Sequence, residues 1–352
     1  MKSAFPTLAG LRSLLAAAVL LVAVLGPAAA QDKGTVYYLA PTLFDEFQVE
    51  SKNMIEKAVG SLGYKVTTLD ALNRADEQLN QFDNIIALKP AAIVLAAVDF
   101  STIIPGIQKA RAAGIPVLIY DRQIKDTEVD LTSVAGTVEI GRMSGKEIVR
   151  LLTERHGAPK GKVLDIMGDP GDAYTLDIED GFQEVIKQYP DIAVITKPAV
   201  MWEPVNAANI ADDQLQVNKD IDFIFMHADH LGPPVVQVLE KHGYKKGDVM
   251  LLMSAGMPVG LDLIREGWAQ VVVEQPLYGQ VYGLAMFLDK IVRKEPLAPG
   301  SYDIIGLPST LSVEKWGPNL KVPGHAITAA NVDDTANWGN LTPPAQAVTP
   351  VP

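Results

Sequence analysis

Short apolar runs alternate with amphipathic stretches along most of this chain, at a spacing of roughly 25 residues. In the first half the apolar runs are residues 35–40, 65–70, 91–97 and 117–120, and the stretches between them read as helices. Such alternation is typical of βαβ units, in which helices cover both faces of a parallel sheet. The pattern predicts an α/β fold built on a doubly wound parallel sheet.

The same pattern restarts at residue 161. Strand-like runs follow at 161–168, 192–200, 222–228, 249–256 and 269–276, and the chain continues with a helix over 278–293 and a strand at 302–307. A chain of 352 residues is long enough for two domains. We therefore predict two α/β halves of similar size.

The N-terminal segment has a different character. Lys2 and Arg12 supply positive charge, and the apolar run at 14–25 is too short to span a bilayer comfortably. An Ala-x-Ala pattern then ends at Ala30, which predicts a secretory signal peptide cleaved there, so that the mature chain begins near Gln31 in a bacterial periplasm. The sequence contains no cysteine, which excludes a disulfide framework and a lipoprotein anchor.

The composition argues against several classes of function. The chain carries 42 acidic and 30 basic residues, whereas a nucleic-acid-binding domain needs a basic surface. It has no G-x-S-x-G, G-x-G-x-x-G or P-loop motif, and His227 and His230 alone are too few to define a metal site. We therefore predict no enzyme activity, no cofactor, no metal and no nucleic-acid partner.

Polar side chains directly follow several of the predicted strands. Asp121 and Arg122 end one strand without any polar transition, and His227, Asp229 and Gln275 stand at other strand ends. In parallel α/β sheets, ligands bind in the crevice beyond the carboxyl ends of the strands. These side chains are therefore candidates for ligand contact, although Asp121 as a turn residue and Arg122 as an exposed charge remain the simpler alternative.

Aromatic side chains occur close to the same strand ends. Phe44 and Phe47 follow the first strand, Tyr174 lies in the loop at 168–174, and Trp202 follows a later strand. The C–H faces of a sugar stack on aromatic rings, while its hydroxyls need carboxylate, amide or guanidinium partners. This combination indicates a site for a hydroxylated small molecule.

Three segments together resemble a known family. The stretch AAVDFSTIIPGIQKARAAGIPVLIYDRQ, the helix containing DGFQEVI and the strand end VEQP are similar to those of the type I periplasmic binding proteins of ATP-driven sugar importers, the ribose- and galactose-binding group. The likeness covers residues 34–316. It implies a monomer of two doubly wound lobes that closes on its ligand about a hinge of three crossovers, near Gly136, 275–276 and 307–308.

The resemblance also implies domain boundaries. Residues 31–136 with 276–307 would form the N-terminal lobe, residues 137–275 with 308–323 the C-terminal lobe, and residues 324–352 an extended, partly disordered tail. Trp338 either holds part of this tail against a lobe or lies in an exposed segment.

Several family contacts can be carried over to this chain. Phe47 matches an aromatic residue that stacks on the sugar, and Asp121 with Arg122 matches the pair that binds the ring oxygen and hydroxyls. Gln275 matches the hinge glutamine, and Trp202 (or Met201) falls where an aromatic residue of the second lobe lies. The resemblance therefore implies that the first lobe keeps the family's contacts.

Three positions of the second lobe depart from the family. Ile178, Ala228 and Ala255 stand where ribose binders have arginine, asparagine and aspartate. Because each change removes a partner for a ligand hydroxyl, the resemblance argues against ribose and favours a polyol, a modified sugar or another small polar metabolite. His230 and Glu274 are further candidates for replacement contacts.

The predicted ligand-binding residues are Phe44, Glu46, Phe47, Asp121, Arg122, Tyr174, Trp202, His227, Asp229 and Gln275. By its resemblance the protein is the periplasmic solute-binding component of an ABC importer, which delivers a sugar, polyol or similar solute to a permease in the inner membrane. A periplasmic sensory receptor for a sensor kinase or chemoreceptor is the alternative, since such receptors share the fold. The sequence leaves the identity of the ligand open.

Overall fold

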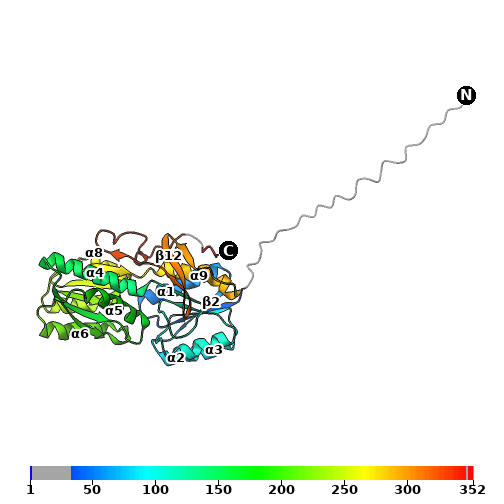
Figure 1. Ribbon diagram of the computed structural model, residues 1–352, viewed down its shortest axis with the longest axis horizontal. Coiled ribbons are helices and arrows are strands. Elements are labelled where there is room, and N and C mark those ends of the chain that lie inside the picture. The colour runs from blue at the N-terminus through cyan, green and yellow to red at the C-terminus, as the bar shows by residue number, and fades with distance from the viewer. Residues whose placement is uncertain (2–32, 346–347, 352) are drawn as a thin grey trace. The chain divides into compact units, whose positions relative to one another are not determined.

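The computed structural model describes Met1, residues 33–345 and residues 348–351, so the predicted signal peptide lies outside the described residues. The described residues form two β-sheets, one of eight strands and one of six. Figure 1 shows helices α1, α2, α3 and α9 around one sheet and α4, α5, α6 and α8 around the other. This is the α/β architecture of two parallel-sheet lobes that the sequence predicts. Among the described helices, none combines the length and hydrophobicity that a membrane span requires.

The first sheet has the strand order β11-β12-β13-β5-β4-β3-β1-β2, and its strands from β1 to β5 are mutually parallel. Its strands are β1 (Thr35–Ala40), β2 (Lys65–Asp70), β3 (Ala92–Leu95), β4 (Val117–Tyr120), β5 (Leu131–Val134), β11 (Gly300–Ile304), β12 (Leu307–Glu314) and β13 (Gly317–Lys321). The helices of this lobe are α1 (Glu46–Ser61), α2 (Ala75–Ile86), α3 (Ile104–Ala112) and α9 (Leu277–Val292).

The second sheet has the order β14-β10-β9-β8-β6-β7 and is parallel except for β14. Its strands are β6 (Gly161–Met167), β7 (Ile192–Pro198), β8 (Phe223–Met226), β9 (Met250–Ala255), β10 (Ala269–Glu274) and β14 (Ala326–Ile327). Its helices are α4 (Thr137–His156), α5 (Ala173–Ile186), α6 (Pro204–Val217), α7 (Gly232–Lys241) and α8 (Pro258–Arg265), with 3₁₀ turns η1 (Val200–Trp202), η2 (Asp229–Leu231) and η3 (Trp338–Asn340).

Local sequence explains where these elements begin. The central strands β3, β4 and β8 are buried at every residue, as continuous apolar runs require when helices cover both faces. Asp45 caps α1 by accepting a hydrogen bond from the Gln48 amide (2.9 Å), and Asp172 caps α5 through the Tyr174 amide (2.9 Å). Both caps place an aspartate at the end of a sheet where strands meet helices, which is also where the site lies.

Within the described residues the chain passes between the sheets three times: from β5 to α4, from β10 to α9, and from β13 to β14. The third passage corrects the expected crossover at 307–308, because residues 319–321 of β13 pair in parallel with residues 132–134 of β5. Strands β11, β12 and β13 form antiparallel pairs that extend the first sheet at its edge. Residues 308–321 therefore belong to the first lobe, and the chain crosses only after Lys321.

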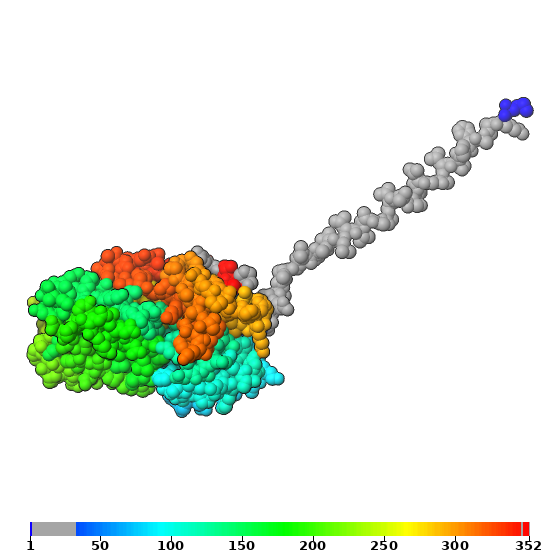
Figure 2. Space-filling model, viewed as in Figure 1, coloured from blue at the N-terminus to red at the C-terminus, as the bar shows by residue number. Residues whose placement is uncertain are grey.

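The segment after residue 323 also differs from the extended tail that was expected. Strand β14 pairs antiparallel with β10, and Trp338 is only 1% exposed. Further along, the amide of Val351 donates to the Met286 carbonyl on α9 (3.0 Å). Figure 2 shows the orange-red part of this segment lying over the green second lobe. The few apolar residues of this segment do not recur at the spacing of a helix or a strand. The sequence pattern therefore gave no indication that they are buried.

These pairings lead us to propose revised lobe boundaries. The first lobe comprises residues 33–134 and 277–321, and the second comprises residues 137–274 and 326–340. The residues between these segments form the hinge.

Candidate ligand-binding site

A cavity of about 40 Å³ lies between the two lobes, at the carboxyl ends of both parallel sheets. Its polar lining is Asp45, Gln48, Asp121, Arg122, Asp172, Tyr174, His230 and Gln275, and its apolar lining is Phe47, Trp202, Ala228, Ala255 and Met257. A space of this size holds only a few water molecules, so the described conformation is a nearly closed cleft. Six of the predicted residues line it: Phe47, Asp121, Arg122, Tyr174, Trp202 and Gln275.

Asp121 is held in place by two glutamines from different elements. It follows β4 with a positive φ of 68°, and its carboxylate accepts hydrogen bonds from Gln48 Nε2 (3.1 Å) and Gln275 Nε2 (2.5 Å). Gln48 lies in the first turn of α1, and Gln275 follows β10 at the hinge. Burial raises the pKa of Asp121, while Arg122 and the two amides oppose this shift. The carboxylate is thus fixed before any ligand arrives.

Arg122 connects the two lobes. Its Nη1 donates to the Ala97 carbonyl (2.9 Å), and its Nε lies 3.0 Å from Asp172 Oδ2 and 3.5 Å from Asp121 Oδ2. Asp172 also accepts a hydrogen bond from Trp202 Nε1 (3.1 Å). Burial raises the pKa of Asp172 to about 7, and it outweighs the opposite effect of Arg122. The nearer of the two charge partners of Arg122 therefore belongs to the other lobe.

Aromatic rings form two walls of the cavity. Phe47 comes from the first lobe and packs edge-on against Trp338 with ring centroids 5.5 Å apart. Trp202 comes from the second lobe, in η1, where it has a positive φ of 59°. Its indole covers Gly168, where any Cβ would lie about 2.0 Å from the ring, so only glycine permits this position. One aromatic face per lobe therefore reaches the cavity.

Two buried polar atoms at the cavity lack hydrogen-bond partners among the described residues: the hydroxyl of Tyr174 and Nδ1 of His230. Ser254 lies close enough to Tyr174 to influence its pKa, but its hydroxyl donates to the His227 carbonyl (2.7 Å). His230 uses its other nitrogen to donate to the Trp202 carbonyl (3.0 Å). Because leaving buried polar groups unpaired is unfavourable, both atoms are suited to a ligand hydroxyl.

The other four predicted residues do not line the cavity in this conformation. The side chain of Phe44 is 70% exposed, and Glu46 is an exposed residue whose Oε2 accepts from the Val259 amide of the other lobe (3.4 Å). Asp229 is buried and accepts from the Met257 amide (2.6 Å), so it holds the start of α8. His227 is buried below the cavity wall, where burial lowers its pKa to about 3.

Other residues at the site were not predicted from the sequence. The cavity is also lined by Asp45, Gln48, Asp172 and Met257. The two aspartates are helix N-caps, and the sequence could have identified them as such because each stands directly before an amphipathic stretch. Of the three departures from the family, Ala228 and Ala255 line the cavity, whereas Ile178 is buried in the core of the second lobe. Glu274 lies 3.0 Å from His325 and anchors the C-terminal segment instead.

Known sugar-binding proteins resemble this chain in sequence and in fold. The chain is 26% identical to the ribose import binding protein of Bacillus subtilis over 241 residues, which cover 68% of this chain and 76% of that protein. It is 28% identical to the multiple sugar-binding periplasmic receptor ChvE of Rhizobium radiobacter over 259 residues, which cover 69% of this chain and 73% of that protein. A galactofuranose binding protein has the same fold, with a TM-score of 0.76 at 17% identity, over 88% of this chain and 99% of that one.

Two facing α/β lobes with a polar, aromatic-walled cavity between them define a protein that binds a small molecule in an interlobe cleft. The chain belongs to the periplasmic binding protein domain family, whose sequence profile matches residues 36–296.

Proposed function

We propose that this protein captures a sugar, a polyol or a similar small hydroxylated solute in the periplasm and delivers it to the membrane permease of an ABC importer. It acts as a monomer, without catalysis, cofactor or nucleic acid. The cleft between Phe47 and Trp202, with the fixed Asp121 carboxylate at its edge, carries this proposal. The similarity to the ribose import binding protein of Bacillus subtilis supports the transport role, and the similarity to the multiple sugar-binding periplasmic receptor of Rhizobium radiobacter supports a sugar as the ligand.

The arrangement suits the two kinds of surface that a sugar or polyol presents. The rings of Phe47 and Trp202 can cover its C–H faces, while Asp121 and Arg122 meet its hydroxyls. The free hydroxyl of Tyr174 and Nδ1 of His230 offer additional polar partners from the second lobe. A ligand between the lobes would thus satisfy groups on both.

Closure follows from contacts that join the lobes directly. In addition to the Arg122–Asp172 pair, Lys125 Nζ lies 2.6 Å from Asp177 Oδ1, and Asn73 Nδ2 donates to the Met201 carbonyl (3.1 Å). All of these contacts are lost when the cleft opens. A ligand that touches both lobes shifts the population toward the closed form, which is the form that docks on the permease.

The alanines of the second lobe limit which ligands fit. Ala228 and Ala255 offer no side-chain donor or acceptor where they line the cavity, so the ligand should present few hydroxyls toward that wall. A polyol or a modified sugar that lacks hydroxyls at those positions meets this condition better than ribose does.

The first test is thermal unfolding of the mature chain, residues 31–352, against a library of sugars, polyols, cyclitols, sugar acids and amino acids. A ligand that binds only the native state raises the unfolding midpoint. At a ligand concentration of 100 times the dissociation constant, it adds about 2.7 kcal/mol to the free energy of unfolding. Asp121→Ala should abolish the shift while the unliganded protein still unfolds cooperatively. Retention of the shift in this variant would show that the site lies elsewhere.

The transport role has its own test. Cells that lack this protein should lose uptake of the identified ligand, and uptake should return with the wild-type chain but not with Asp121→Ala. Normal uptake combined with the loss of a transcriptional or chemotactic response to the ligand would favour the sensory receptor.

A further inference from the structure

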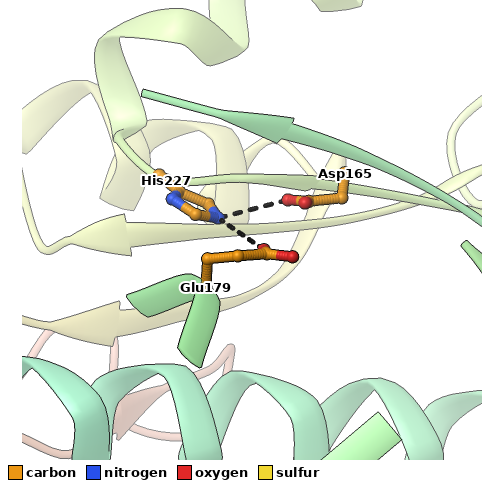
Figure 3. A group of neighbouring side chains, drawn as sticks. All are labelled: Asp165, Glu179 and His227. Atoms are coloured by element: carbon orange, nitrogen blue, oxygen red, sulfur yellow. Dashed lines mark ion pairs between the residues drawn. The ribbon is translucent and has the colours of Figure 1, made fainter. Parts of the chain in front are cut away.

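Three titratable side chains from different elements meet inside the second lobe, below the cavity wall. Asp165 lies on β6, Glu179 on α5, and His227 directly follows β8 (Figure 3). His227 Nε2 is 3.1 Å from Asp165 Oδ1 and 4.0 Å from Glu179 Oε2. One potential donor atom from each residue lies within 4.8 Å of the other two. The side chains therefore converge on one point.

Hydrogen bonds do not account for this convergence. Among the described residues, both oxygens of Asp165, both ring nitrogens of His227 and Oε2 of Glu179 have no hydrogen bond of ordinary geometry. Asp165 and His227 are completely buried, although Glu179 and Thr196 lie close to Asp165. Buried polar groups in native proteins are almost always paired, so this many unpaired atoms in one place require an explanation.

The distances and directions suit a shared cation. A metal ion bound at about 2.0 to 2.2 Å by each donor places the donor atoms roughly 3 to 3.5 Å apart. The 3.1 Å separation of His227 and Asp165 is within this range, yet the carboxylate lies off the direction in which the imidazole would donate a hydrogen bond. Neighbouring ligands of one ion have this relation, because each lone pair is directed at the metal and not at the other ligand.

The surrounding residues orient the donors. Gln183 Nε2 donates to Glu179 Oε1 (2.9 Å), which leaves Oε2 as the oxygen facing His227. The ring of Phe225 packs 4.8 Å from that of His227 and fixes its plane. A hydrogen-bonded outer partner such as Gln183 is typical of a ligating carboxylate. Glu179, whose side chain is 20% exposed, provides the route of entry and needs only a small movement to close the remaining distance.

We propose that Asp165, Glu179 and His227 bind one divalent transition-metal ion, of which Zn²⁺ is the representative, and that this ion braces β6, β8 and α5 behind the ligand cavity. Two carboxylates balance its charge, and the imidazole selects it over Ca²⁺ or Mg²⁺, which prefer oxygen ligands. The spacing of His227 and His230 gave no reason to predict a metal, because the other two ligands come from separate elements. His227, one of the three proposed ligands, directly precedes Ala228, which lines the cavity.

The test uses the mature chain without a histidine tag, dialysed against a chelator and then titrated with Zn²⁺ by calorimetry and a competing indicator. We expect one ion per chain and a higher unfolding midpoint. Glu179→Gln keeps the size of a partly exposed side chain and should weaken Zn²⁺ binding by roughly 100-fold. His227→Gln should do the same.

Matched controls separate this site from others. His242 forms a surface pair with Asp212 (2.6 Å), so His242→Gln tests for adventitious surface binding and should leave the affinity unchanged. Asp121→Ala should also bind Zn²⁺ normally, whether or not the proposed transport ligand is correct. Absence of Zn²⁺ binding to the wild-type chain, or equal affinity in wild type and Glu179→Gln, would overturn the proposal and leave the three side chains as a proton-sharing cluster.

Discussion

At the scale of single residues, the site depends on side chains that are positioned before a ligand binds. Asp121 accepts hydrogen bonds from two glutamines. The Trp202 indole donates to Asp172 and packs against Gly168, which has no side chain to displace it. Preorganisation of this kind reduces the ordering cost of binding. The contribution of each side chain to binding can therefore be measured as the change in ligand affinity when that side chain is replaced.

Trp202→Ala should weaken binding of the ligand identified in the screen by roughly tenfold, because it removes one aromatic wall and the stacking it provides. Trp202→Phe should recover much of the affinity. Met201→Ala is the matched control, since the neighbouring Met201 is 45% exposed and does not line the cavity. Calorimetric titration of the three variants measures the difference, and equal affinities would remove Trp202 from the site.

At the scale of elements, the C-terminal segment contacts both lobes close to the hinge. Trp338, in η3, donates from Nε1 to the Ala255 carbonyl of β9 (2.7 Å) and packs against Phe47 of α1. Its amide donates to Glu274 at the end of β10 (3.1 Å). One tryptophan therefore contacts both lobes, directly behind the ring that lines the cavity.

Trp338→Ala should lower the free energy of unfolding by about 3–5 kcal/mol, the usual effect of removing a buried tryptophan. Denaturant unfolding of the mature chain measures this change. Leu341→Ala, three residues further on and 54% exposed in the wild type, serves as the control and should change stability little. Equal stability of the two variants would mean that the segment does not contribute to the fold.

The same segment carries a pH-dependent contact. His325 Nδ1 lies 3.0 Å from Glu274 Oε2, and the hydrogen bond to Glu274 raises the pKa of His325. Because the folded state holds this proton more tightly than the unfolded state, the contribution is complete below about pH 6.5 and is lost as the pH rises through the folded pKa. The unfolding free energy of the wild type should therefore fall relative to His325→Gln above pH 6.5. Parallel pH profiles for the two proteins would contradict this.

At the scale of the whole molecule, the balance between open and closed forms depends on charge pairs across the cleft. Asp172→Asn keeps an N-cap for α5 but removes the charge that Arg122 meets at 3.0 Å. The ligand-free variant should open more often, which small-angle scattering records as a larger radius of gyration. Asp83→Asn removes a pair within the first lobe, with Lys109 at 2.9 Å, and should leave the radius unchanged.

Much of this fold could be predicted from the local hydrophobic pattern of the sequence. The features that could not be predicted share one cause. The buried runs of β3, β4 and β8 were located correctly because parallel strands covered on both faces are apolar throughout. The hairpin of β12 and β13 was assigned to the wrong lobe because β13 joins its sheet by pairing with β5, 187 residues earlier, and no local pattern encodes a partner at that distance. The buried position of Trp338 was missed for the same reason.

By itself, the sequence determined the α/β class, the family and the polar pair Asp121–Arg122 at a strand end, because periodicity and strand-end chemistry are local properties. Only the tertiary structure decided which strand-end residues meet. Successive side chains at a strand end point in different directions, so Ala228 faces the cavity while His227 is directed into the second lobe beside Asp165 and Glu179. Whether a side chain binds a sugar, anchors a helix or joins a cluster depends on what the rest of the chain places opposite it.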